Sequence, residues 1–423
     1  MRKESLKRQA MITACCGALV RAMGFGLRLW ISRLLGAEAL GVTELASGAH
    51  MLALTPAAAG LPSAVSRLTA KAENDEQRRL TLYAGRQMAA WMGLCVTPLF
   101  LFLSPLLARL LGDERTLPAL VFFAPCVLTV GLSSVYDGYF FGRGKALPPA
   151  LSEGAEQIVR LGVVGALAFL VPRVTVAYRA ALPAVASTLG EAAGLAVILA
   201  MAGSIPSFRK DSRLPDRRRK LFSLSLPLLL NRFCHTGLRS LCGVIIPQRL
   251  MAGGLDKAEA MSRLGMFSGM AMPLMFLPCL ISGALAAVGG PAMARCKTKQ
   301  AENRLALRLL SAGLATGLLS AAGLYALAPY VSNLFYRLPE LTPLLRAAVP
   351  LAVLLPVQQT VNGMMTGLGL QKRSLAAGLL GAAATLLCTW QWTSARGIYG
   401  AAFASMAGHG LILFCELISL LLR

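Results

Sequence analysis

Two apolar stretches of this chain carry the same pair of arginines. The first reads Arg21-Ala-Met-Gly-Phe-Gly-Leu-Arg28, and the second, 211 positions further on, reads Arg232-Phe-Cys-His-Thr-Gly-Leu-Arg239. Seven residues make about two turns of an α-helix, so each pair lies within roughly 20° of one helix face. A charge inside a bilayer is unfavourable and usually faces a partner, a water-filled cavity or a substrate. Because guanidinium groups stay charged and bind phosphate oxygens in a bidentate way, the pattern predicts an anion site.

Other polar residues at membrane depth leave alternatives open for these arginines. Arg28 and Arg239 lie near one end of their stretches, where a long side chain can reach the membrane interface. Each arginine can also pair with an intramembrane acid. Glu156 and Arg160, four residues apart, predict a local salt bridge. The candidate ion-pair or proton-coupling residues are Glu44, Asp137, Glu191 and His235.

The composition is that of a polytopic membrane protein. Of the 423 residues 56% are hydrophobic and only 14% are charged, whereas a soluble chain carries roughly a quarter charged residues. The net charge of +23 resides mainly in connectors between apolar runs, which argues for membrane topology and against nucleic-acid binding. The ten cysteines show no metal-binding spacing with the three histidines, so free thiols and no metal site are expected.

Apolar runs of about 20 residues predict twelve membrane-spanning helices. Lysine and arginine concentrate in alternate connectors, which predicts cytoplasmic N- and C-termini in the cell membrane. Breaks that can act as hinges within spans are predicted at Gly60-Leu61-Pro62, Pro227, Pro247, Pro273, Pro278 and Pro356. The expected spans are 10–31, 40–61, 82–108, 117–141, 151–171, 178–203, 221–248, 261–288, 305–328, 341–368, 374–393 and 397–421.

A basic segment, residues 204–220, divides the chain into two bundles of six spans, residues 1–203 and 221–423. We expect this segment to be a cytoplasmic linker that lies near anionic headgroups. The overall prediction is therefore an all-α membrane protein built from two six-helix bundles.

The two bundles also share landmarks outside the arginines. Asp137-Gly138 precedes Gly142 and Gly144, and Asn362-Gly363 precedes Gly367 and Gly369 at an offset of 225 positions. Ala64-Val65 and Ala287-Val288 each precede a basic stretch. Corresponding connectors lie on the same side of the membrane, so the repeat is parallel and its pseudo-twofold axis follows the membrane normal.

Enzyme motifs are not found in the sequence. It has no HExxH, GxSxG or P-loop motif and no loop long enough for a catalytic domain. The prediction is a non-enzymatic, monomeric transporter without a cofactor, whose partners are membrane lipids and an anionic substrate.

Several segments in order along the chain resemble a known family. It is the stage V sporulation protein B-like group of polysaccharide and lipid-linked-oligosaccharide flippases, in the superfamily of multidrug-and-toxin-extrusion (MATE) exporters. The segments are Ser32-Arg-Leu-Leu-Gly-Ala-Glu-Ala-Leu-Gly41, Gly60-Leu-Pro-Ser-Ala-Val-Ser-Arg67, Gly142-Arg-Gly-Lys145 with Glu156-Gln157-Ile-Val-Arg160, Ile246-Pro-Gln-Arg-Leu250, Gly269-Met-Ala-Met-Pro273 and Gly397-Ile-Tyr-Gly-Ala-Ala402.

The resemblance implies two bundles around a central cavity, with the first and seventh spans as its inner walls. It implies alternating-access movement of a sugar linked to undecaprenyl pyrophosphate, such as a peptidoglycan precursor in cell-wall synthesis or sporulation, to the outer leaflet. It also implies that Arg21 and Arg28, with Arg232 and Arg239 as repeat mates, hold the pyrophosphate. The alternative is a proton- or sodium-coupled MATE-type exporter of small molecules, in which Glu44, Asp137 and Glu191 line the cavity.

Overall fold

The computed structural model describes residues 3–58, 60–203, 211–296 and 298–422, and this part of the chain is helical without a β-strand. The predicted all-α class is therefore confirmed. Contacts between residues divide the chain into two compact units. Unit 1 comprises Met1–Leu35 and Leu45–Ser240, and unit 2 comprises Gly36–Glu44 and Leu241–Arg423.

The first helix, α1 (Lys3–Ala58), is two helices joined at Gly36. Gly36 has a φ of 76° and a ψ of 170°, a conformation that glycine adopts readily because it has no Cβ. The joint separates the two spans predicted at 10–31 and 40–61. It also begins the short segment of α1 that packs within unit 2.

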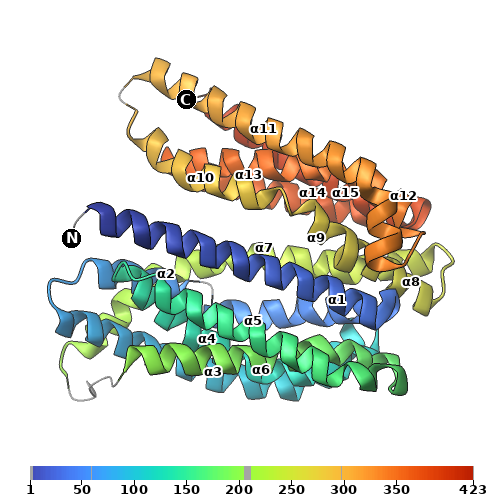
Figure 1. The fold of residues 1–423 in the computed structure, drawn as a ribbon, viewed down its shortest axis with the longest axis horizontal. Helices are drawn as coiled ribbons and strands as arrows, with labels where there is room; N and C mark the ends of the chain where they lie inside the picture. Colours follow the sequence, from blue (N-terminus) through green and yellow to red (C-terminus); the bar gives the residue numbers. More distant parts are fainter. Residues whose placement is uncertain (1–2, 59, 204–210, 297, 423) are drawn as a thin grey trace. The chain divides into compact units, whose positions relative to one another are not determined.

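In unit 1 the long helices run side by side (Figure 1). The α4 helix packs against α2, α3 and α6, and α5 packs against α6. After α1 the helices of this unit are α2 (Leu61–Ala70), α3 (Asp75–Leu110), η1 (Glu114–Thr116), α4 (Leu117–Gly142), α5 (Leu147–Leu167), η2 (Ala168–Arg173), α6 (Val176–Ala202) and the first part of α7 (Leu214–Ala252).

Unit 2 repeats this arrangement, with α13 packed against α10, α11 and α15, and α14 packed against α15. Its core near one end gathers Met293, Val357, Val361, Met364 and Met365. After α7 the helices are α8 (Lys257–Leu264), η3 (Gly265–Ala271), α9 (Met272–Met275), α10 (Cys279–Ala294), α11 (Lys299–Tyr330), η4 (Val331–Tyr336), α12 (Leu341–Ala348), α13 (Leu351–Gly367), α14 (Gln371–Arg396) and α15 (Ile398–Leu421).

Eight helices in the described residues are long and apolar enough to cross a membrane. A ninth span is added if Lys257–Met275 and Cys279–Ala294, which meet at a bend of 48°, count as one broken span. By length and composition alone, the structure therefore has fewer membrane-spanning helices than the twelve predicted from the sequence. The other three expected spans fall on the two parts of α1 and on α7, and polar residues such as Arg232 lower the hydropathy of α7.

The broken span has an identifiable cause in its sequence. Pro273 and Pro278 each remove a backbone donor, and a π-helical turn over Gly265–Ala271 precedes them. In unit 1, α1 ends at Ala58 and α2 begins at Leu61, with Pro62 in its first turn. The predicted breaks at Gly60-Leu61-Pro62 and at Pro273 and Pro278 are therefore confirmed. The breaks predicted at Pro227, Pro247 and Pro356 are wrong, because α7 continues through the first two and α13 through the third.

The landmarks of the sequence repeat are close helix contacts in both units. A Cβ added to Gly138 would lie 2.3 Å from the Pro62 carbonyl oxygen, and one added to Gly142 would lie 2.6 Å from that of Ser66. In unit 2 the same holds for Gly363 beside Ala286, at 2.6 Å from its Cβ, and for Gly367 beside the Gly290 oxygen, at 2.1 Å. The offsets are 225 for α4 and α13 (138 to 363) and 224 for α2 and α10 (62 to 286). The repeat is therefore structural, and its register on α10 is one residue beyond the Ala64-Val65 and Ala287-Val288 pairing expected from the sequence.

The second half of the predicted linker, from residue 211 onward, is built into unit 1 instead of forming a free connector. Residues 204–210 lie outside the described residues, but Leu214 and Leu221 are buried in the core beside Leu80. Arg213 bonds to Glu76 at the start of α3 and to Asp211. The side-chain and backbone hydrogen bonds that Arg213 donates to Asp211 lower the pKa of the Asp211 carboxyl. The start of α7 is therefore held by both apolar packing and ion pairs.

Candidate functional site

The first part of α1 carries Arg21 and Arg28 on one side, here called the arginine stripe, and this side lies near α5. Arg21 and Arg28 are both exposed, and Gly24 lies between them on the same side of the helix. A Cβ added to Gly24 would lie 3.6 Å from the Gln157 Nε2 atom of α5. One turn before Gln157, the Glu153 carboxyl is within the electrostatic reach of Arg21. Arg21 therefore has an acidic neighbour that the sequence analysis did not single out.

Apolar contacts hold α1 in this position. Leu27 packs with Val164 of α5 and Ala186 of α6 in a small buried cluster. A Cβ on Gly165 would lie 3.3 Å from the Trp30 ring. Because Leu27 lies between the two arginines and Trp30 directly beyond them, the register between α1 and α5 is fixed by packing as well as by charge.

An ion-pair triad joins α5 to α6. The Arg160 guanidinium bonds to Glu156 on its own helix, and its Nη2 atom lies 2.9 Å from the Glu191 Oε1 atom of α6. The predicted Glu156–Arg160 salt bridge is confirmed, and the structure adds Glu191 to it. Two carboxylates share one guanidinium, so the triad carries excess negative charge when both are ionised.

Small residues let α5 and α6 approach closely enough to form this triad. A Cβ on Gly190 would lie 2.6 Å from the Arg160 Cγ atom. One turn on, the Ser152 hydroxyl donates a 2.8 Å hydrogen bond to the Gly194 carbonyl. Glycine at both positions allows direct contact between the helices, as is common in membrane bundles.

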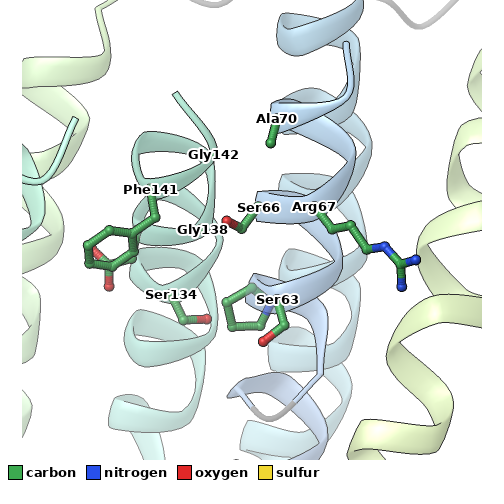
Figure 2. Close-up of a pocket in the computed structure, with 10 residues that line it drawn as sticks. Ser63, Ser66, Arg67, Ala70, Ser134, Gly138, Phe141 and Gly142 are labelled. Atoms are coloured by element: carbon green, nitrogen blue, oxygen red, sulfur yellow. The ribbon is translucent and has the colours of Figure 1, made fainter. Parts of the chain in front are cut away.

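Asp137 connects the acidic residues to a cavity. It lies half-buried on α4 within the electrostatic reach of Glu153 and Glu156. It also lines a cavity of about 540 Å³ between α2 and α4, shown in Figure 2. The lining residues are Pro62, Ser63, Ser66, Arg67, Ala70, Ser134, Asp137, Gly138, Phe141 and Gly142. The three serines were not predicted as site residues, because isolated serines in spanning helices carry no specific signal.

The second arginine pair lies on the part of α7 that belongs to unit 1. Arg232 and Arg239 are exposed, as are Arg21 and Arg28. This part of α7 packs on the second part of α1, where the Ser240 hydroxyl donates a 2.8 Å hydrogen bond to the Gly48 carbonyl. All four arginines are therefore carried by one compact unit.

The remaining candidate residues are separated by the structure. Glu44 is half-buried on the segment of α1 that packs within unit 2, whereas Asp137 and Glu191 lie in unit 1. The side chain of His235 lies outside the described part of the structure. Among the described residues, no group of three or more histidine, cysteine, aspartate or glutamate side chains has a metal-binding arrangement.

Comparison with known proteins places most of the chain in one sequence family. Residues 6–297 match the family described as "Polysaccharide biosynthesis protein". The chain is 28% identical over 437 residues to stage V sporulation protein B of Bacillus subtilis (strain 168), covering 97% of this chain and 83% of that protein.

Solved structures show the same fold at low sequence identity. An inward-facing MATE family multidrug resistance transporter superposes with a TM-score of 0.76 and 17% identity, covering 94% of this chain and 92% of that one. The lipid II flippase MurJ in an inward closed conformation superposes with a TM-score of 0.75 and 14% identity, covering 97% and 87%. The predicted family resemblance and the MATE-like fold are therefore confirmed.

Proposed function

Because this chain belongs to the polysaccharide biosynthesis protein family, we propose that it is a flippase for a lipid-linked anionic glycan. The proposed substrate is a sugar on an undecaprenyl pyrophosphate carrier, such as a peptidoglycan precursor, moved to the outer leaflet by alternating access. The observation that carries this proposal is the set of four exposed arginines, Arg21, Arg28, Arg232 and Arg239, on apolar helices of one unit. The similarity to a sporulation protein supports a setting in cell-wall or spore-envelope synthesis.

The chemistry of arginine suits a pyrophosphate. A guanidinium donates parallel hydrogen bonds to two phosphate oxygens, and it does so more strongly where water is scarce. An interior-negative membrane potential favours outward movement of a polyanion by about 2.3 kcal/mol per charge per 100 mV. The acidic residues near Arg21 would keep that arginine oriented between transport cycles.

The proposal includes a topology and an assembly state. The protein spans the membrane many times, and we place it in the cell membrane with both termini in the cytoplasm. We keep residues 1–203 and 221–423 as the two transport bundles and residues 204–220 as their cytoplasmic linker. The role is non-enzymatic, and a monomer suffices for it.

Replacement of the arginines tests the proposed anion site. Arg21→Ala combined with Arg232→Ala should lower the flipping rate of a fluorescent undecaprenyl-pyrophosphate glycan in reconstituted vesicles by about tenfold or more, because two charge-assisted contacts are lost. Arg21→Lys should give an intermediate rate, since lysine keeps the charge but loses the bidentate geometry.

A matched control is available on the same helix. Arg33 is also exposed on α1 but lies about 120–140° around the helix from the stripe, so Arg33→Ala should flip the lipid at the wild-type rate. Melting temperatures in detergent establish that the variants are folded. Wild-type flipping by the folded Arg21→Ala, Arg232→Ala protein would refute the proposed site.

A second candidate function is favoured by the acids of unit 1. Asp137, Glu153, Glu156 and Glu191 lie near one another, and Arg160 forms ion pairs with Glu156 and Glu191. This excess of acids suits a proton- or sodium-coupled exporter of cationic small molecules. Such a protein would expel a cationic dye from the same vesicles when a proton or sodium gradient is imposed. Dye export without lipid flipping would favour this function over the first.

A further inference from the structure

The cavity between α2 and α4 has a polar lining, in which the Ser134 hydroxyl donates a 3.0 Å hydrogen bond to the Gly131 carbonyl of its own helix. Figure 2 shows Ser63 and Ser66 on α2 and Ser134 on α4 with their hydroxyls turned toward the space between the helices, while Arg67 extends away from α4. Among the described residues, none forms a hydrogen bond with the side chains of Ser63, Ser66 or Asp137. A half-buried carboxylate and two hydroxyls therefore have bonding capacity to spare.

Unit 2 contains the same helix crossing without this lining. The glycine contacts of α4 on α2 recur between α13 and α10 at offsets of 225 and 224, so each lining residue has an equivalent position. On α10 the equivalents of Ser63, Ser66 and Arg67 are Ala287, Gly290 and Pro291. On α13 the equivalents of Ser134, Asp137 and Phe141 are Gln359, Asn362 and Thr366.

The polar groups that unit 2 does have at this crossing are used internally. The Ser282 hydroxyl donates a 2.8 Å hydrogen bond to the Gln359 side chain, and the Asn362 amide donates one of 2.9 Å to the Ser374 hydroxyl. The crossing thus packs with both of these polar side chains hydrogen-bonded within unit 2, although Asn362 is exposed. Packing does not require the serines and Asp137 in unit 1, so their presence at an open cavity points to a ligand.

The kind of ligand follows from the groups present. Asp137 lies in the cavity wall with Glu153 and Glu156 in electrostatic reach, which disfavours a phosphate. Hydroxyls that both donate and accept, beside a carboxylate that accepts, match a neutral group rich in hydroxyls. A volume of about 540 Å³ is within the usual range of small-molecule sites and accommodates a sugar.

We propose that the α2/α4 cavity of unit 1 binds the carbohydrate headgroup of the transported lipid. This inference rests on the proposed flippase function and assigns the sugar to residues separate from the arginines proposed for the pyrophosphate. Ser63, Ser66 and Ser134 exchange hydrogen bonds with sugar hydroxyls, and Asp137 accepts from them. The recognition of the glycan is then confined to one of the two repeats.

The test changes the lining to the residues that unit 2 carries. Ser63→Ala with Ser66→Gly removes two hydroxyls, and separately Asp137→Asn removes the charge of the carboxylate. Both variants carry side chains that this helix crossing already accommodates at Ala287, Gly290 and Asn362. The probes are undecaprenyl pyrophosphate with a disaccharide and the same lipid pyrophosphate without sugar. Their binding to detergent-solubilised protein is measured by titration. Ser311→Ala on α11, an exposed serine outside the cavity, is the control.

We expect both cavity variants to bind the disaccharide lipid about tenfold more weakly. The serine variant loses two hydroxyl partners of the sugar, and Asp137→Asn replaces a charge-assisted hydrogen bond with a weaker neutral one. Binding of the sugar-free lipid should stay within about twofold of the wild-type value, a change below 0.5 kcal/mol. The Ser311→Ala protein should bind both lipids as the wild type does.

Other results would overturn the inference in distinguishable ways. Equal weakening of both lipids, or no weakening of either, shows that the cavity does not bind the sugar. An effect of Asp137→Asn alone, on both lipids and altered by sodium or pH, identifies an ion site instead. If the wild-type protein binds neither lipid, the proposed flippase function itself fails.

Discussion

The role of an individual charged residue in this protein depends on which side chains surround it more than on its depth in the membrane. Arg160 bonds to Glu156 and to Glu191. Arg21, in contrast, is exposed and interacts electrostatically with Glu153. The first arginine is committed to holding α5 and α6 together. The second retains bonding capacity for a ligand, and it is the one that the sequence repeat marks.

The triad makes a stability prediction at this scale. Arg160→Leu should lower the free energy of unfolding by about 3 kcal/mol, because it leaves two partly buried carboxylates facing each other. Glu191→Gln should have a much smaller effect, since it leaves the Glu156–Arg160 pair intact and neutral. Melting temperatures in detergent report the difference, and equal shifts for the two variants would argue against a structural role for the triad.

At the scale of helices, glycine contacts decide which elements pack together. The α2/α4 crossing in unit 1 and the α10/α13 crossing in unit 2 both bring backbone against backbone at two glycines one turn apart. Side chains around these crossings differ, but the glycines recur at the same offset. The helix crossing is therefore the element that the two units share. The side chains that line the cavity beside the crossing differ between unit 1 and unit 2.

Substitution of these glycines should be unfavourable in both units. Gly138→Ala and Gly367→Ala would place a Cβ 2.3 Å and 2.1 Å from a backbone oxygen. Overpacking of this kind costs about 1–3 kcal/mol, so both variants should melt several degrees lower than the wild type.

Two glycines in open positions provide the comparison. Gly154 on α5 and Gly323 on α11 have nothing within 4 Å of an added Cβ. Alanine there should be neutral or stabilise the helix by up to about 1 kcal/mol. Similar losses at all four positions would contradict a special role for the close contacts, because helix propensity alone favours alanine over glycine.

At the scale of the whole molecule, the division into units follows contacts rather than the order of spans. The first part of α7 belongs to unit 1, and the Gly36–Glu44 segment of α1 belongs to unit 2. Leu221, fully buried in the unit 1 core, shows why α7 is assigned this way. A helix that follows the linker in sequence is thus part of the body that precedes it.

Truncation of one leucine tests this assignment. Leu221→Ala should destabilise unit 1 by about 2–5 kcal/mol through lost packing and a cavity. The next residue, Phe222, is 55% exposed, so Phe222→Ala should have little effect on the melting temperature in detergent. A larger loss for Phe222 than for Leu221 would contradict the placement of α7 in the unit 1 core.

The sequence by itself determined the all-α membrane class, the breaks at Gly60 and Pro278, the Glu156–Arg160 pair and the internal repeat. These depend on composition, local backbone preference and spacing along one helix, which are all properties of neighbouring residues. Only the tertiary structure decided that Glu191 joins Arg160, that Glu153 lies beside Arg21 and that Ser63, Ser66 and Ser134 meet Asp137 at one cavity. Those contacts join helices distant in sequence, and their register depends on how small residues let the helices pack.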